Sequence, residues 1–213
     1  MQGSIMPSGN TPLTHAEQVD RYRSEFANIA TGYYVSGRLA AQAQLVGVHG
    51  NLLHHAIEMY LKAALVRTIS IDKLASKGYG HNLKRLWTAF KQIDWKDIEA
   101  RNSPPIESRF DQTISDLDMF WDIRYPDKTV TSGQASYIAW SCRNPEPEYT
   151  NAPPGSLPPP RYQVVINEVD CLVIVILGRV PRAPATLLPM FTLAKEALLS
   201  SNPCAHSWIS PGG

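Results

Sequence analysis

The stretch Asn51-Leu-Leu-His-His-Ala-Ile-Glu-Met-Tyr-Leu-Lys-Ala-Ala-Leu-Val66 decides the fold of this 213-residue chain. It contains neither proline nor glycine, and its large aliphatic side chains recur at the three- and four-residue spacing of one helix face. The same spacing continues on the N-terminal side of this stretch and predicts one long, kinked helix from Tyr33 to about Thr68. Gly47 and Gly50 weaken the middle of that helix. The predicted apolar face consists of Leu45, Val48, Leu52, Leu53, Ile57, Leu61 and Leu65.

Further helices are predicted on both sides of this one. Thr14 and Glu17 form a capping box, so a first helix begins there and ends before Gly32. Ser103 followed by two prolines is a typical helix start, and Pro126 disfavours helical geometry in the residue before it. The apolar run 164–180 has the length of a buried helix, although its β-branched residues also suit a strand. The predicted flanking helices cover about 14–30, 81–93, 104–124, 164–180 and 185–200, with a turn at 77–80.

Residues 127–162 differ in character from the rest of the chain. They contain seven prolines between positions 145 and 160 and show no helical spacing, which predicts a long loop. Within it, 137–140 could form a short strand. The expected fold is therefore all-α, an antiparallel up-and-down bundle of five to six helices with a long Pro-rich loop. We expect a single domain over 1–213, with a core at about 14–126 and 163–200 and the loop inserted at 127–162.

Composition excludes several classes of protein. The net charge of +1 gives no global field that would draw the chain to nucleic acid or to a membrane. The three cysteines, Cys142, Cys171 and Cys204, are widely spaced, and none of them belongs to a Cys-x-x-Cys motif. This argues against a disulfide framework or a zinc ribbon. Residues 1–12 lack the features of a secretory signal, and the apolar run 171–177 is far shorter than the ~20 residues of a membrane helix. We expect a cytoplasmic protein with reduced thiols and no membrane contact.

A polar ridge accompanies the apolar face of the central helix. His54, Glu58 and Lys62 are spaced by four residues, and Glu58 precedes Lys62 in the order that favours a helical ion pair. The plainest interpretation is a solvated or half-buried salt-bridge ridge. His54 or His55 with Glu58 would supply two metal ligands, but a tetrahedral site needs more, and no second cluster of histidine or cysteine stands out. We therefore expect no metal and no cofactor.

Three short motifs, in order, resemble those of HEPN domains (higher eukaryotes and prokaryotes nucleotide-binding). The stretch 53–63 resembles the signature helix of that family. Gly80-His81-Asn82-Leu83 resembles the Gly-His-x-Leu that begins the next helix, and Arg124-Tyr125-Pro126 resembles the Arg-Tyr-Pro that closes a later one. The resemblance covers about 16–126 and implies an antiparallel helical bundle, commonly a homodimer.

The resemblance also implies a context, because HEPN proteins are often linked to RNA cleavage, to toxin–antitoxin pairs with nucleotidyltransferases and to phage defence. The nuclease branch carries an arginine followed, after four to six residues, by a histidine, a pair that would stabilise phosphate charge and shuttle protons. After Arg124, the corresponding positions are Thr129, Val130 and Thr131. The usual dyad is absent, which argues against metal-independent ribonuclease activity.

The candidate functional residues follow from these motifs. Arg124 ends a predicted helix, where it would pair with Glu58 or contact an anion. His81 opens a helix as a capping or packing residue, and Lys84 would join a basic rim for phosphates. The candidate ligand-binding set is His54, Glu58, Lys62, His81, Lys84 and Arg124, with Arg124 and His81 as the weak catalytic candidates.

Three functions remain open on the sequence. The first is a non-catalytic HEPN-like module that binds a nucleotide, RNA or another nucleic acid, or a partner protein such as a nucleotidyltransferase. The second is a metal-independent ribonuclease with a displaced dyad of Arg124 and His81 or His54. The third is a plain dimeric interaction scaffold.

Overall fold

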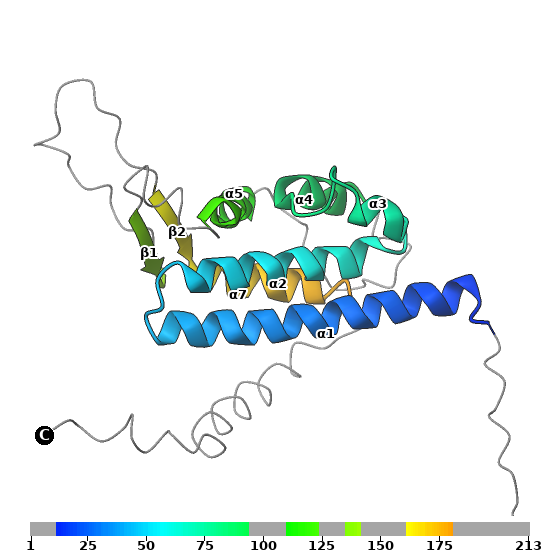
Figure 1. Ribbon diagram of the computed structural model, residues 1–213, viewed down its shortest axis with the longest axis horizontal. Helices are drawn as coiled ribbons and strands as arrows, with labels where there is room; N and C mark the ends of the chain where they lie inside the picture. The colour runs from blue at the N-terminus through cyan, green and yellow to red at the C-terminus, as the bar shows by residue number, and fades with distance from the viewer. Residues whose placement is uncertain (1–11, 94–109, 124–134, 142–160, 181–213) are drawn as a thin grey trace, which may run out of the picture.

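The computed structural model describes residues 12–93, 110–123, 135–141 and 161–180, and its architecture is mostly helical, as expected (Figure 1). Helix α2 (Val48–Leu65) is central and contacts every neighbouring helical layer. Helix α1 (His15–Gln42) lies along one side of α2, and α4 (Leu83–Gln92) and α5 (Asp111–Met119) lie on the other. The all-α prediction is confirmed, and the prediction for 185–200 lies outside the described residues.

The α2 face that decides the fold is buried as predicted. Its side chains Leu53, Ile57, Leu61 and Leu65 have no exposed surface. Fully burying one such side chain contributes about 1.5–3 kcal/mol to folding. This stripe therefore lies in the core between α2 and the helices that pack on it.

The boundary between the first two helices differs from the prediction. Helix α1 continues through Gly32 to Gln42, and the chain turns at 43–47, where Gln44 has φ +57° and Gly47 has φ +87°. Leu45 and Val48 are expected on the buried face but are about half exposed. Leu45 lies in this turn, and Val48 directly follows it. A glycine inside a helix costs only about 1 kcal/mol, and the long packing contact between α1 and α2 outweighs that cost.

The segments after α2 contain one helix that the sequence analysis missed. Helix α3 (Ile71–Ala75) begins after Ser70, whose side chain accepts a hydrogen bond from the Lys73 amide. The turn at 77–80 is confirmed, and α4 is capped by Asn82 rather than by His81. After α5, the chain continues as the 3₁₀ helix η3 (Phe120–Ile123). The predicted start at Ser103 and the predicted end at Arg124 lie outside the described residues.

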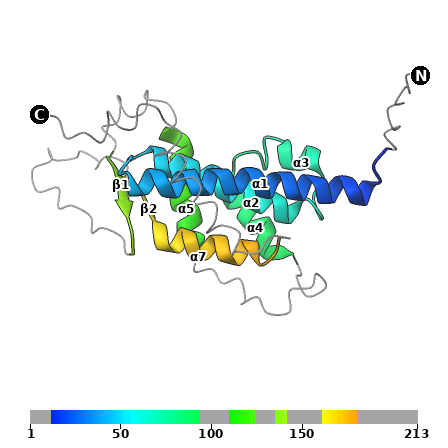
Figure 2. The ribbon, with the colours of Figure 1, turned by 90° about the horizontal axis from the view of Figure 1, so that it is seen from below.

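A small parallel sheet adds to the helices. Strand β1 (Ala135–Ala139) pairs with β2 (Arg161–Val165), with Ala135 opposite Arg161 and Ala139 opposite Val165. Strand β2 runs directly into α7 (Ile166–Leu177), as Figure 2 shows. The predicted helix over 164–180 is therefore wrong at its start, because Val164 and Val165 complete a strand that pairs with β1. Within the described parts of the chain, no helix has the length and apolarity to cross a membrane.

His49 is a titratable group sealed inside the core. It has no exposed surface, donates a hydrogen bond from Nδ1 to the Leu45 carbonyl at 3.4 Å, and packs edge-on against Phe120. Burial lowers the pKa of His49 below its ordinary 6.5, and the hydrogen bond to Leu45 offsets this only in part. At mildly acid pH the unfolded chain therefore binds a proton that the folded chain resists.

We accordingly expect His49→Gln to flatten the acid limb of stability. Below pH 6.5, the parent protein should lose up to about 1.4 kcal/mol of unfolding free energy per pH unit through this one group, the ceiling for one proton. Urea unfolding of both proteins between pH 7.5 and 5 measures the difference. If the two profiles run parallel, His49 carries its proton in the folded state and the interpretation is wrong.

Candidate functional site

The polar ridge of α2 is buried, not solvated or half buried as predicted. Glu58 has no exposed surface, His54 is 1% exposed and Lys62 is 7% exposed. The reason is tertiary, because α4, α5 and η3 all pack on α2 and close over this side of it. Charged groups at this depth need partners that compensate their lost hydration.

Glu58 is held by three nitrogen-bearing side chains. Lys62 donates from Nζ to Oε1 at 2.6 Å, and the His81 Nδ1 lies 3.0 Å from Oε2. His55 adds its Nδ1 at 3.4 Å from the same Oε2. Burial acts to raise the pKa of Glu58, but hydrogen bonds from His55, Lys62 and His81 outweigh it and hold the pKa at about 2. The centre of the bundle therefore contains an ionised carboxylate at neutral pH.

His81 connects this buried carboxylate to the surface. It lies in the turn just before the Asn82 cap of α4, and half of its side chain is exposed. Its ring stacks on Trp121 of η3, with centroids 4.0 Å apart and planes 20° apart. Because Glu58 engages Nδ1, the ring is fixed and Nε2 is the nitrogen that a bound molecule would meet.

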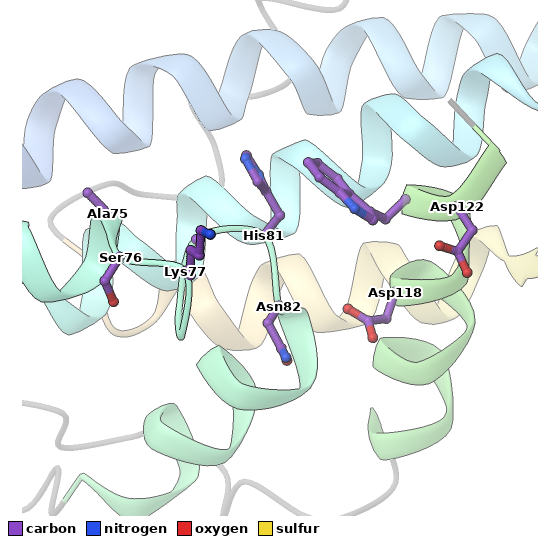
Figure 3. A pocket seen from close by; sticks show the side chains of 9 residues that line it. Ala75, Ser76, Lys77, His81, Asn82, Asp118 and Asp122 are labelled. Atoms are coloured by element: carbon purple, nitrogen blue, oxygen red, sulfur yellow. The ribbon is translucent and has the colours of Figure 1, made fainter. Parts of the chain in front are cut away.

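A pocket of about 660 Å³ opens beside His81 (Figure 3). Its walls come from the turn after α3, the start of α4, the end of α5 and η3. Asp118 is fixed at the wall because its Oδ1 accepts a hydrogen bond from the Leu83 amide at 3.0 Å. The lining residues that carry polar or aromatic groups are Ser76, Lys77, His81, Asn82, Asp118, Trp121 and Asp122. The pocket combines hydrogen-bond acceptors, one lysine and a stacked ring pair.

The structure brings together four of the six predicted site residues. His54, Glu58, Lys62 and His81 form one cluster, in which the His54 Nδ1 donates to the Leu117 carbonyl at 3.0 Å. Burial lowers the pKa of His54, which favours a neutral, structural role for that ring.

Of the other two predicted residues, Lys84 lies outside the cluster. Lys84 is mostly exposed, and its Nζ lies 4.0 Å from the Asp118 carboxylate. Arg124, expected to pair with Glu58, lies outside the described residues. The predicted ion pair of Glu58 with Lys62 is confirmed, and His55 and His81 also contact the Glu58 carboxylate.

Sequence reasoning missed three contributors. His55 was weighed only as half of a metal pair, yet it lies three residues before Glu58 and contacts its carboxylate. Trp121 is only partly buried, and its ring stacks on that of His81. Asp122 lines the pocket from η3. Only the His55 spacing was visible in the sequence, because the other two depend on how η3 meets α4.

The site also contains a set of side chains able to hold a metal ion. His55, Glu58 and His81 each offer one ligand atom, and these atoms lie within 4.8 Å of one another. No metal is expected from the sequence, because no second cluster of histidine or cysteine stands out in it. In the structure the single residue His81, 23 residues after Glu58, lies beside His55 and Glu58 as a third candidate ligand.

Comparison of the chain with protein-family models, with curated proteins and with solved structures gives no match. The likeness to HEPN domains therefore rests on the three short sequence motifs. Two of them, in α2 and at the start of α4, form the site described above. The third, at Arg124, lies outside the described residues.

Proposed function

We propose that this chain is a non-catalytic HEPN-like helical module that binds a nucleotide or a short single-stranded segment of RNA in the pocket beside His81. The observation that supports this most is the half-exposed His81 ring stacked on Trp121 at the pocket wall. Unstacked bases bind proteins by stacking on aromatic side chains and by hydrogen bonds along the base edges.

The ring pair has the properties of a stacking surface. Trp121 supports His81 from one side, and the hydrogen bond to Glu58 prevents the imidazole from turning. A base that contacts the exposed half of His81 would thus meet a fixed ring, so little conformational entropy would be lost on binding. Stacking of one base on an aromatic side chain contributes about 1–3 kcal/mol.

The rest of the pocket supports one orientation of such a ligand. Asp118 and Asp122 accept hydrogen bonds, which suits the amino and imino groups of a base and disfavours phosphate. Lys77 is the cation of the lining, and Lys84 lies at the edge near Asp118. We therefore infer that the base faces the aspartates and that a phosphate lies toward the lysines. With so few phosphate contacts, the affinity should depend only weakly on salt.

Binding of labelled single-stranded RNA and of nucleoside monophosphates tests this proposal. We expect the parent protein to bind and His81→Ala to bind about tenfold more weakly, because one stacking contact of about 1.4 kcal/mol is lost. His15→Ala, at the exposed start of α1, is the matched control and should bind as the parent does. Failure of the parent to bind any of these ligands, or equal binding by His81→Ala, would contradict the proposal.

A ribonuclease is the second candidate, and one contact favours it. A buried carboxylate that orients a half-exposed histidine, as Glu58 does with His81, is a common arrangement for proton transfer. Arg124 would complete the displaced dyad. The labelled RNA of the binding experiment decides between the two functions on a denaturing gel, because a ribonuclease would cut it and His81→Ala would not. Intact RNA after incubation with the parent would exclude this candidate.

Helix α1 offers a surface for the expected homodimer. Tyr22, Ile29 and Tyr33 are 36–47% exposed, and with the partly buried Phe26 they repeat at four, three and four residues along one helix face. Such spacing is that of a helix–helix seam. We propose that two copies pair through this face, which light scattering would show as twice the mass of one chain.

A further inference from the structure

We propose that His55, Glu58 and His81 bind a divalent transition-metal ion of the zinc class at the inner end of the pocket. This site goes beyond the proposed function, since a nucleotide stacked on His81 does not require it. The three side chains come from two separate parts of the chain, with two on α2 and one in the turn before α4. Two imidazoles and one carboxylate form a ligand set that suits zinc and related ions.

Two of the three ligand–ligand distances match those around such an ion. Ligand atoms at 2.0–2.1 Å from a tetrahedral zinc are separated from one another by about 3.3 Å. In this structure, the Nδ1 atoms of His55 and His81 lie 3.4 Å and 3.0 Å from the Oε2 of Glu58. All three ligand atoms lie within 4.8 Å of one another. The two imidazole nitrogens must come closer together than this limit for ideal geometry. Metal binding would then replace the hydrogen bonds that hold the two imidazoles on Glu58.

The surroundings of Glu58 prepare it to be a ligand with one oxygen. Lys62 takes Oε1 at 2.6 Å, so Oε2 is the oxygen on which both imidazoles converge. Outer contacts of this kind fix the orientation of a metal-binding carboxylate. Lys62 also adds a positive charge close to the ion, which lowers the affinity relative to a site without it.

The site is accessible from one side. Glu58 is sealed, but His55 has 22% and His81 has 50% of its side chain exposed. A metal with three protein ligands keeps a fourth position for water or for an atom of a bound molecule. Water would reach that fourth position past the exposed parts of His55 and His81.

Titration of the tag-free, chelator-treated 213-residue chain with Co²⁺ and with Zn²⁺ tests this inference. We expect one equivalent of Co²⁺ to bind per chain, with the visible absorption of a four-coordinate ion, and Zn²⁺ to displace it. His55→Ala and His81→Ala should each weaken Co²⁺ binding at least about tenfold, the lower limit reported even for outer-shell partners. His15→Ala serves as the control for binding to an exposed histidine.

Both substitutions act on side chains that are partly exposed, and circular dichroism checks that the variants remain folded. A second measurement on the parent alone avoids that question, because ring NMR signals of His55 and His81 should shift on addition of Zn²⁺ while those of His49 stay in place. Absence of binding, or binding that neither substitution weakens, would overturn the inference. The metal titration contains no nucleotide, and the nucleotide titration is run with chelator, so either proposal can fail alone.

Discussion

Replacing Glu58 with alanine is expected to lower the free energy of unfolding by about 3–5 kcal/mol, the range observed when one member of a buried ion pair is removed. The Lys62 side chain is 8% exposed, and its ammonium donates to Glu58 at 2.6 Å. Without the carboxylate, that ammonium must stay charged without its partner, lose its proton or force the bundle open. His55 and His81 would lose the same acceptor, which adds to the effect.

Urea unfolding of three variants separates this cause from simple loss of packing. The double substitution Glu58→Ala with Lys62→Met removes both charges and should recover much of the lost stability. Glu25→Ala, at an exposed position of α1, should change stability by less than about 0.5 kcal/mol. If the double variant is as unstable as Glu58→Ala alone, the charge of Lys62 is not what makes the single variant unstable.

Gly50→Ala is expected to destabilise the protein, although alanine is the better helix former. A Cβ built at Gly50 would overlap the Cδ1 and Cε1 atoms of Phe120. Phe120 is itself fully buried, so its ring has to be displaced within a packed core. Overpacking of this kind typically costs about 1–3 kcal/mol, which exceeds the helix preference of at most about 1 kcal/mol.

Gly32→Ala is the matched control for that substitution. Gly32 lies inside α1, is exposed, and a Cβ there would meet nothing within 4 Å. The free energy of unfolding of this variant should therefore rise by about 0.5–1 kcal/mol, the ordinary benefit of alanine over glycine in a helix. Thermal or urea unfolding should thus move in opposite directions for the two variants. Stabilisation by both would mean that Phe120 does not pack against Gly50.

The parts of the fold that the sequence predicts are those in which local spacing and burial agree. Leu53, Ile57, Leu61 and Leu65 follow one helical face, and that face is the core. The capping box of Thr14 and Glu17 also needs only neighbours in the chain, and it is present. Such features depend on few residues close in sequence, so no knowledge of the tertiary structure is required.

The predictions that failed depend on contacts between distant segments. The sequence predicts a helix boundary at Gly32, whereas α1 continues past it and packs along α2. Gly37 allows this packing, because its lack of a side chain lets Leu53 approach. A Cβ at Gly37 would lie 2.9 Å from the Leu53 side chain. Val164 and Val165 form a strand because β1 lies beside them. Neither contact leaves a signal in the local pattern.

In the site too, the features that depend on local spacing were predictable and those that depend on tertiary packing were not. The spacing of His54, Glu58 and Lys62 identified the right ridge, because all three lie on one helix. Its burial, and the approach of His81 and Trp121, depend on how α4 and η3 pack on α2. A fully buried carboxylate surrounded by histidines could not be predicted from a four-residue spacing that also describes a solvated salt bridge.

Photocrosslinking tests the central claim, that the pocket beside His81 binds single-stranded nucleic acid, most directly. Single-stranded RNA that carries 4-thiouridine would be irradiated with the 213-residue chain, and the crosslinked peptides would be identified by mass spectrometry. If RNA binds in this pocket, we expect crosslinks within 76–82 and 118–122, the segments that line it. Crosslinks confined to other segments, or no crosslinks at RNA concentrations well above micromolar, would contradict it.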